Sequence, residues 1–241
     1  MKILKNIALL AILIAFVNCS SYKAKKQEAV LDLPKLGTIV TTKGGALYDA
    51  AEEIGLPGWQ NLKVEVQELP FNIDSYVTYA TYMQKAGKIN TIPFNDSLRY
   101  KPKYLKFKLE DKIGLTTLLN NESHSDMARY LSLDDNNRIV TSLKVAFIES
   151  DVALFLKADA LQLQKDKFDN IIIALVDNGK ESSYYLKDLP VFDYGLSSFC
   201  WGEDRYHNLE IKNIVSEDIK CPKSTHLKAS KIKSDKSYLK F

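Results

Sequence analysis

The sequence predicts an α+β protein built around an antiparallel β meander over about residues 138–187. Four successive runs of strand-forming residues support the meander, separated by short polar segments (139–149, 152–164, 170–176 and 182–186). Asn178-Gly179 lies between the last two runs and is a strong hairpin signal, because both positions of a type I′ turn need positive φ. Helical spacing of apolar residues in the N-terminal half predicts several short helices packed on this meander.

The N-terminal half contains two kinds of pattern. A β-rich segment and two strictly alternating segments predict strands (36–42, 62–69 and 104–109). Apolar residues at helical spacing predict helices (46–54, 75–86, 113–119 and 125–133). Gly55 and Gly87 are suited to end the first two helices, and Ser125 is suited to cap the last one.

The C-terminal half is expected to be mainly β. Residues 171–176 are continuously apolar, which predicts the central strand of the meander, and residues 208–216 could add a fifth strand. We therefore expect a single α+β domain over residues 29–219, with two subdomains as the alternative. A basic C-terminal tail over residues 220–241 would follow this domain.

The start of the chain has the pattern of an export signal. Lys2 and Lys5 precede an uncharged apolar run of 11 residues, 7–17. A run of this length is too short to span a bilayer as a helix, which needs about 20 apolar residues. It has the length of a signal-peptide core, so export from the cytoplasm is expected.

The next residues, Phe16-Val17-Asn18-Cys19, resemble the lipobox of bacterial lipoproteins. The resemblance covers residues 1–21, and it departs from the commonest pattern at Phe16 and Asn18. It implies a signal peptide over residues 1–18 that is removed before Cys19, and lipidation of Cys19 with acyl chains such as palmitate. An ordinary cleaved signal peptide and a structural N-terminal helix are the alternatives.

The same resemblance implies a location. A residue other than Asp after the lipidated cysteine allows sorting to an outer membrane, and Ser20 meets that condition. Residues 19–28 would then form a lipidated polar tether that holds the folded part off the bilayer. The predicted location is the bacterial cell envelope, at the outer membrane and facing the periplasm, with the membrane as a partner through the N-terminal lipid.

Charge is distributed unevenly along the chain, whose net charge is +3. Residues 28–219 contain 21 basic and 29 acidic side chains, a net charge of −8, whereas the tail 220–241 carries +6. An acidic body with basic ends argues against nucleic-acid binding, which needs a basic face on a folded element. The basic tail is either a solvated terminus or a segment that lies against anionic lipid.

Two of the three cysteines and two of the three histidines lie close together in the sequence, at Cys200, His207, Cys221 and His226. With export, and with Cys19 taken by lipid, Cys200 and Cys221 remain as an even pair, which predicts a disulfide. Two free buried thiols are one alternative. The other is a zinc site made of all four residues, although the paired spacings typical of such sites are missing.

Residues 194–207 are predicted to form a long binding loop. Aromatic, basic and acidic side chains are concentrated there, a composition typical of protein contacts (Phe199, Trp201, Glu203, Asp204, Arg205, Tyr206 and His207). The alternative is a disulfide-bonded loop whose aromatic side chains pack on the sheet.

The sequence lacks common catalytic and cofactor motifs, so it predicts no cofactor and no catalytic residue by motif. Together with the anchor, this favours a non-enzymatic envelope lipoprotein that acts as a binding, assembly or accessory subunit for another envelope protein. One alternative is an inhibitor or immunity-type lipoprotein, whose acidic body would meet a basic partner. The other is an envelope hydrolase that uses Glu203, Asp204 and His207, which a deep pocket at Glu203 and His207 would favour.

Overall fold

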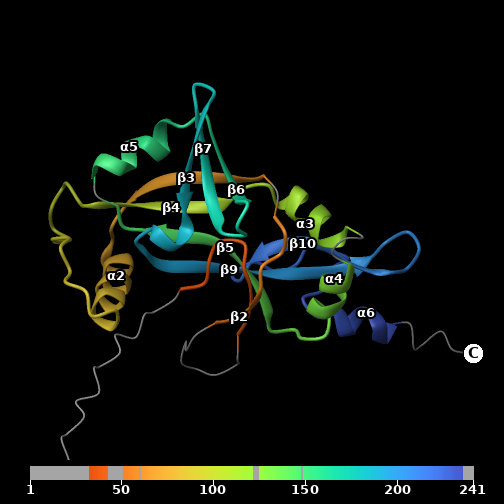
Figure 1. Cartoon of the computed structure of the whole chain (residues 1–241). Helices are drawn as coiled ribbons and strands as arrows, with labels where there is room; N and C mark the ends of the chain where they lie inside the picture. Colours follow the sequence, from red (N-terminus) through yellow and green to blue (C-terminus); the bar gives the residue numbers. More distant parts are fainter. Residues whose placement is uncertain (1–32, 43–50, 60, 122–124, 148, 236–241) are drawn as a thin grey trace, which may run out of the picture.

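Ten strands of the described chain form one continuous antiparallel sheet (Figure 1). The structure is a computed structural model that describes residues 33–42, 51–59, 61–121, 125–147 and 149–235. Its strands are β1 (Ile39–Thr41), β2 (Glu52–Gly55), β3 (Leu62–Pro70), β4 (Lys103–Leu109), β5 (Asn137–Val145), β6 (Ala160–Lys165), β7 (Ile171–Asp177), β8 (Lys180–Tyr185), β9 (Val191–Glu203) and β10 (Leu209–Ser216). Its helices are α2 (Ile73–Lys85), α3 (Lys112–Asn120), α4 (Ser125–Leu131), α5 (Glu149–Lys157), η2 (Leu186–Asp188) and α6 (Ala229–Asp235).

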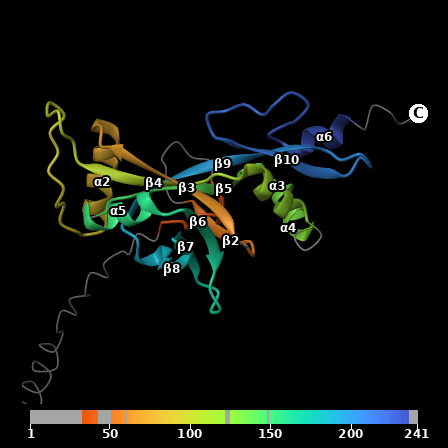
Figure 2. The same cartoon turned by 90° about the horizontal axis from the view of Figure 1, so that it is seen from above.

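The strand order is β10-β9-β5-β4-β3-β6-β7-β8, and β1 pairs with both β2 and β5. β3 joins the two parts of the sheet, because Leu62 and Lys63 pair with β6 whereas Val64–Pro70 pair with β4. In Figure 1, β7 runs across the direction of β3, β4 and β9, and Figure 2 shows β7 and β8 standing off the β9–β10 part. The sheet therefore changes direction at β3, with the main hydrophobic core against it.

Alternation along β4 agrees with the sequence analysis. Leu105, Phe107 and Leu109 are buried in the main core, and the lysines between them are partly exposed. A second, smaller core of aromatic side chains lies under α2, and its buried members are Phe71, Tyr79, Tyr104 and Phe192. Helix α2 begins at a capping box in which Asn72 and Ser75 exchange side-chain-to-backbone hydrogen bonds of 2.8 and 2.9 Å.

The helices gather at the two ends of the sheet. In both views α2 and α5 lie at one end, while α3, α4 and α6 lie at the other (Figures 1 and 2). Helices α2, α3 and α4 fall where the sequence predicts helices at 75–86, 113–119 and 125–133. Across the described residues, no helix combines the length and apolar character needed to cross a membrane.

The predicted meander is confirmed in part. Strands β6, β7 and β8 follow one another in the sheet. β7 and β8 are joined at Asn178-Gly179, whose φ values are 49° and 73° as a type I′ turn requires. The predicted strand at 208–216 is also present, as β10. β7, predicted as the central strand of the meander, lies between β6 and β8, and its first five residues are all buried.

The predicted strand at 152–164 is wrong in its first half, which belongs to helix α5. The helix buries Phe155 while Leu154 and Leu156 stay about half exposed, at 49% and 44%. Val152, Phe155 and Ala158 all pack on the main core, and their spacing of three residues is that of one helix face. As a consequence β5 is separated from β6 in space as well, and it lies between β4 and β9.

The expectation that the N-terminal half mainly supplies several short helices to a C-terminal meander is not borne out. This half supplies β1 to β4, and β3 and β4 lie in the interior of the strand order. Of the helix predicted at 46–54, residues 46–50 lie outside the described residues, and Glu52–Gly55 form strand β2 paired with β1. Long-range strand pairing therefore overrides the local helical pattern at 51–54.

The outer edge of β10 is closed by a side chain of α3. The carboxamide of Asn120 donates to the carbonyl of Ile211 (2.7 Å) and accepts from its backbone N–H (3.0 Å). These are the two hydrogen bonds that a neighbouring strand would have made. Asn120 thus occupies one position of a missing strand and blocks edge-to-edge pairing there.

We predict that Asn120→Ala lowers the free energy of unfolding by about 1–3 kcal/mol, because both backbone groups of Ile211 lose their partner. Urea unfolding measures the difference. Asn121→Ala is the matched control, since Asn121 is adjacent and exposed, and we expect its effect to stay within about 0.5 kcal/mol. Equal effects of the two substitutions would contradict the edge-capping role.

Candidate functional site

The candidate site lies at the end of β9, where this strand extends beyond its neighbour β5. Their pairing ends at Ile139 opposite Ser197, whereas β9 continues to Glu203. Beyond that point the chain after β10 returns to the free edge of β9. The backbone N–H of Trp201 donates to the carbonyl of His226 (2.7 Å), and the N–H of His226 donates back to the carbonyl of Trp201 (2.9 Å).

A disulfide fixes this returning segment. Cys200 on β9 is bonded to Cys221, with 5.6 Å between the Cα atoms, and Cys200 is fully buried. The predicted disulfide is therefore present in the structure. The zinc alternative made of Cys200, His207, Cys221 and His226 is wrong, because sulfurs joined to each other are not available as thiolate ligands. Within the described residues no group of three or more His, Cys, Asp or Glu side chains could hold a metal ion.

A wide groove lies beside the disulfide, with a volume of about 1010 Å³. We call it the disulfide groove, and it is lined by the end of β9, by β10 and by the segment that follows Cys221. Its lining residues are Gly202, Glu203, His207, Lys212, Asn213, Pro222, Ser224, Thr225, His226 and Ile232. Three predicted site residues, Glu203, His207 and His226, therefore border the same groove.

Gly202 is required by a close approach in this groove. A Cβ at Gly202 would lie 2.5 Å from Cγ and 3.3 Å from Cε of Lys212 on the paired strand. The aliphatic stem of Lys212 therefore packs over the glycine backbone, and its ammonium group forms an ion pair with Glu210. A larger residue at position 202 would displace Lys212 and change the shape of the groove.

Glu203 and His207 form a pair at the mouth of the groove. The Nδ1 atom of His207 lies 2.7 Å from a carboxylate oxygen of Glu203. The Glu203 side chain is 25% exposed and the His207 side chain 77% exposed. The carboxylate thus orients the imidazole, but the imidazole stays largely in solvent.

The turn that places His207 is built by Asp204. One carboxylate oxygen accepts from the backbone N–H groups of Tyr206 (2.8 Å) and Asn208 (2.7 Å), and the other accepts from the carboxamide of Asn208 (3.1 Å). The hydrogen bond from the backbone N–H of Asn208 is the main cause that lowers the pKa of the Asp204 carboxyl below its usual value. His207 itself adopts a left-handed backbone with φ of 64°.

The predicted long loop over residues 194–207 is wrong as a description of the backbone. Val191–Glu203 form the single strand β9, and the turn is confined to the residues after it. Phe199 and Trp201 are each 3% exposed and belong to the core, as the packing alternative proposed. Tyr206 remains exposed, at 67%, with the guanidinium of Arg205 4.7 Å from its ring centroid.

The same turn occurs a second time, between β6 and β7. Asp166 accepts from the backbone N–H groups of Phe168 (2.8 Å) and Asn170 (2.9 Å), and from the carboxamide of Asn170 (3.0 Å). The fourth residue, Asp169, has φ of 63°, and Lys167 lies 4.9 Å from the ring of Phe168. Both turns share the pattern Asp, basic, aromatic, any residue, Asn, a repeat that the sequence analysis missed although the two segments can be aligned by eye.

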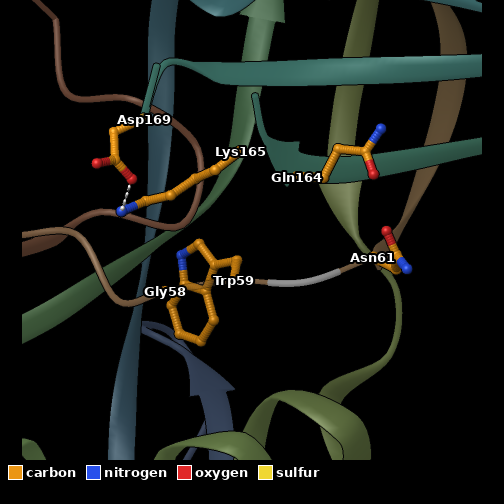
Figure 3. Close-up of a pocket in the computed structure, with 6 residues that line it drawn as sticks. All are labelled: Gly58, Trp59, Asn61, Gln164, Lys165 and Asp169. Atoms are coloured by element: carbon orange, nitrogen blue, oxygen red, sulfur yellow. Dashed lines mark hydrogen bonds and ion pairs between the residues drawn. The ribbon is translucent and has the colours of Figure 1, made fainter. Parts of the chain in front are cut away.

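A second cavity of about 480 Å³ adjoins this second turn (Figure 3). Its lining residues are Gly58, Trp59, Asn61, Gln164, Lys165 and Asp169. Figure 3 shows Lys165 reaching to Asp169 beside the indole of Trp59, and the ion pair measures 3.4 Å. Trp59 is 2% exposed and its Nε1–H donates to the carbonyl of Gly37 (2.9 Å), so the indole is part of the core. No sequence signal had pointed to this cavity.

Left-handed backbone conformations concentrate at the two cavities. His207 and Ser224 border the disulfide groove, and Asn61 and Asp169 border the Trp59 cavity. Positive φ is rare for residues other than glycine and is often found at binding sites. The disulfide groove, which is the larger and is bordered by the Glu203–His207 pair, is the stronger candidate site.

Comparison of the chain with family models, with curated proteins and with solved structures finds no match.

We predict that the double variant Cys200→Ala/Cys221→Ala lowers the free energy of unfolding by about 3 kcal/mol, because the disulfide closes a loop of 21 residues in the unfolded chain. Thermal unfolding in the presence and absence of a reductant measures this. The reductant should lower the Tm of the wild type by roughly 6–12 °C and leave the double variant unchanged. An insensitive wild type would contradict the structural role of the bond.

We predict that acid opens both Asp turns. The pKa of the Asp166 carboxyl is lowered mainly by the hydrogen bond from the carboxamide of Asn170. The pKa of the Asp204 carboxyl is lowered mainly by the hydrogen bond from the backbone N–H of Asn208. The folded pKa of each lies below the value of about 3.9 for a free Asp. The stabilisation is therefore present above about pH 4 and lost as the pH falls through the folded pKa. In an NMR titration the amide signals of Asn170 and Asn208 should move with midpoints below about 3.9; midpoints above it would refute the carboxylate contacts.

Proposed function

We propose that the protein is a lipid-anchored protein of the bacterial cell envelope that binds another envelope protein in the disulfide groove, as a non-enzymatic accessory or assembly subunit. The observation that carries the binding part is the groove itself, about 1010 Å³ in volume and bordered on one side by a disulfide-bonded segment. A site held open by covalent and strand contacts loses little entropy on binding, which favours affinity.

The lining of the groove supports a polypeptide as the ligand. Gly202 and Ile232 are buried and supply backbone and apolar surface at the base. Glu203, Lys212 and Thr225 supply both signs of charge and a hydroxyl around it. Apolar surface surrounded by polar side chains is the arrangement typical of protein interfaces.

The anchor rests on the N-terminal sequence alone. Residues 1–32 lie outside the described residues, so the export signal and the lipobox at Phe16-Val17-Asn18-Cys19 are its support. Several acyl chains hold a protein stably on a bilayer, whereas a single chain is marginal. The proposed location is the outer membrane, facing the periplasm.

The hydrolase is the second candidate, and the Glu203–His207 pair is the observation that favours it. A carboxylate 2.7 Å from an imidazole nitrogen is how many enzymes orient a general base. The hydroxyl of Ser224, however, donates to the carbonyl of Lys223, so it is turned to the backbone. The imidazole is also largely in solvent, so we rank this activity below binding.

We predict that a photoreactive p-benzoylphenylalanine in place of Lys212, in the full chain expressed in its own host, crosslinks to a discrete envelope protein. The same residue in place of Lys180 on β8 is the matched control, because both lysines are exposed on outer strands and Lys180 lies outside the groove. The adducts are resolved by gel electrophoresis, and incorporation of labelled palmitate is measured in parallel with a Cys19→Ser variant.

Three outcomes separate the parts of the proposal. An adduct from position 212 and none from position 180 supports a binding groove, and equal adducts from both oppose it. Palmitate label that disappears in Cys19→Ser supports the anchor, and label that persists shows that the anchor assignment is wrong. Turnover of peptidoglycan or ester substrates that Glu203→Gln abolishes would replace binding with hydrolysis as the function.

A further inference from the structure

The connection between α2 and β4, residues 86–102, is long but held in place. The ring of Phe94 stacks on that of Tyr76 of α2, with 4.5 Å between centroids. The hydroxyl of Tyr76 donates to the carbonyl of Ile92 (3.2 Å) and accepts from the carboxamide of Asn90 (2.8 Å). The aromatic core under α2 therefore fixes the middle of the connection.

Other apolar side chains of this connection point to solvent. Ile89 is 83% exposed, Leu98 56% and Tyr100 85%. Ile89 and Leu98 would each gain about 1.5–3 kcal/mol if a partner buried them fully. Tyr is also typical of the membrane–water interface, since its ring is apolar and its hydroxyl polar.

The charge of this region is opposite to that of the body around it. Residues 86–102 contain three basic side chains, Lys88, Arg99 and Lys101, and one acidic side chain, Asp96, although residues 28–219 as a whole carry −8. Asp96 forms an ion pair with Lys101. Lys88 lies 5.8 Å from the ring centroid of Tyr82, and the guanidinium of Arg99 lies 5.9 Å from that of Tyr100. Basic and exposed apolar side chains are thus interleaved, the composition of surfaces that bind anionic membranes.

The described chain begins next to this region. Leu33 and Pro34 line the same small cavity as Tyr82 and Lys88, at the end of α2. Thirteen residues separate Leu33 from Cys19, and a chain of that length reaches at most about 45 Å when fully extended. A lipid on Cys19 would therefore lie within that distance of the end of α2, which lets this surface reach the bilayer.

We propose that the α2–β4 connection is a second membrane contact, which lies on anionic lipid headgroups and inserts Ile89, Leu98 and Tyr100 into the interface. The proposal rests on the lipid anchor of the proposed function. The anchor brings the surface within reach, and Lys88 and Arg99 attract it to the headgroups. Anionic lipid is the occupant because the patch combines net positive charge with apolar side chains beside the start of the tether.

The contact would orient the whole protein. In both views the α2 end of the sheet lies opposite the turn between β9 and β10 (Figures 1 and 2). That turn contains His207 at the mouth of the disulfide groove. Lipid at the α2 end therefore leaves the groove directed away from the membrane, where a periplasmic partner can reach it.

The test compares two Arg-Tyr pairs at opposite ends of the molecule. The full lipidated chain is mixed with vesicles of phosphatidylcholine alone, or of equal parts phosphatidylcholine and phosphatidylglycerol. Hydrogen exchange is then measured along the backbone. Arg99→Ser/Tyr100→Ser is the test variant. Arg205→Ser/Tyr206→Ser is the matched control, because Arg205 also lies over an exposed Tyr ring, at 4.7 Å.

We expect exchange in residues 86–102 to slow on the anionic vesicles and to stay unchanged on phosphatidylcholine, with residues 203–208 unaffected. The test variant should lose this protection, and the control variant should behave as the wild type. When both variants also carry Cys19→Ser, so that no lipid holds the chain, the test variant should bind anionic vesicles about fivefold more weakly for the lost charge alone. Unchanged exchange in 86–102 on vesicle-bound protein, or equal loss in both variants, would overturn the contact.

Failure of the anchor gives a different result. If the wild type floats with vesicles no better than a full chain carrying Cys19→Ser, the lipid assignment fails. The contact is then judged from the Cys19→Ser chain at saturating anionic vesicles. Slowed exchange in 86–102 supports the contact there, and unchanged exchange overturns it.

Discussion

Strand β9 imposes the constraint on which the rest of the C-terminal half depends. It has two edges along 13 residues, and its buried backbone groups need hydrogen-bond partners on both. β10 supplies one edge near Trp201, and β5 supplies the other up to Ser197. β5 offers no partner residue beyond Ser197, so the backbone of His226 pairs with that of Trp201 on this edge instead. The disulfide, α6 and the groove all belong to the segment that returns to this unpaired part of β9.

Part of the basic C-terminal segment, expected to be a tail, packs on the fold after the chain returns to β9. Ala229 and Ile232 of α6 are buried in the main core, so residues up to Ile232 take part in the fold although their composition is Lys-rich. Two apolar side chains three residues apart on a short helix are enough to dock it, and Lys231 between them stays exposed. The division of the chain into domains remains a prediction.

Local chemistry could be read from the sequence where a short motif determines the backbone. Asn178-Gly179 specifies its turn by itself, and the Cys200–Cys221 pair was predicted from the count of cysteines and from the expected export. Partner choice could not be read, since β5 pairs with β4 and β9 across long stretches of chain. Trp201 was assigned to a loop because aromatic and glycine residues are dense there, and only the pairing with β10 and His226 shows that it belongs to a strand. Glu203, His207 and His226 were singled out by residue type, whereas the volume between them depends on tertiary contacts.

The β6–β7 and β9–β10 turns have the same sequence pattern and the same hydrogen bonds, so we expect that one could replace the other. Asp166 and Asp204 each close a hairpin through the same set of hydrogen bonds, so the five residues from Asp to Asn fold as a unit. Within that unit the fourth position, Asp169 in one turn and His207 in the other, has a left-handed backbone. Its side chain pairs with the residue four positions earlier, which is Lys165 for Asp169 and Glu203 for His207. The two turns thus share one set of backbone hydrogen bonds and differ at this position, which holds a carboxylate in one and an imidazole in the other. Exchanging the two pentapeptides would move an imidazole from one end of the sheet to the other without rebuilding either hairpin.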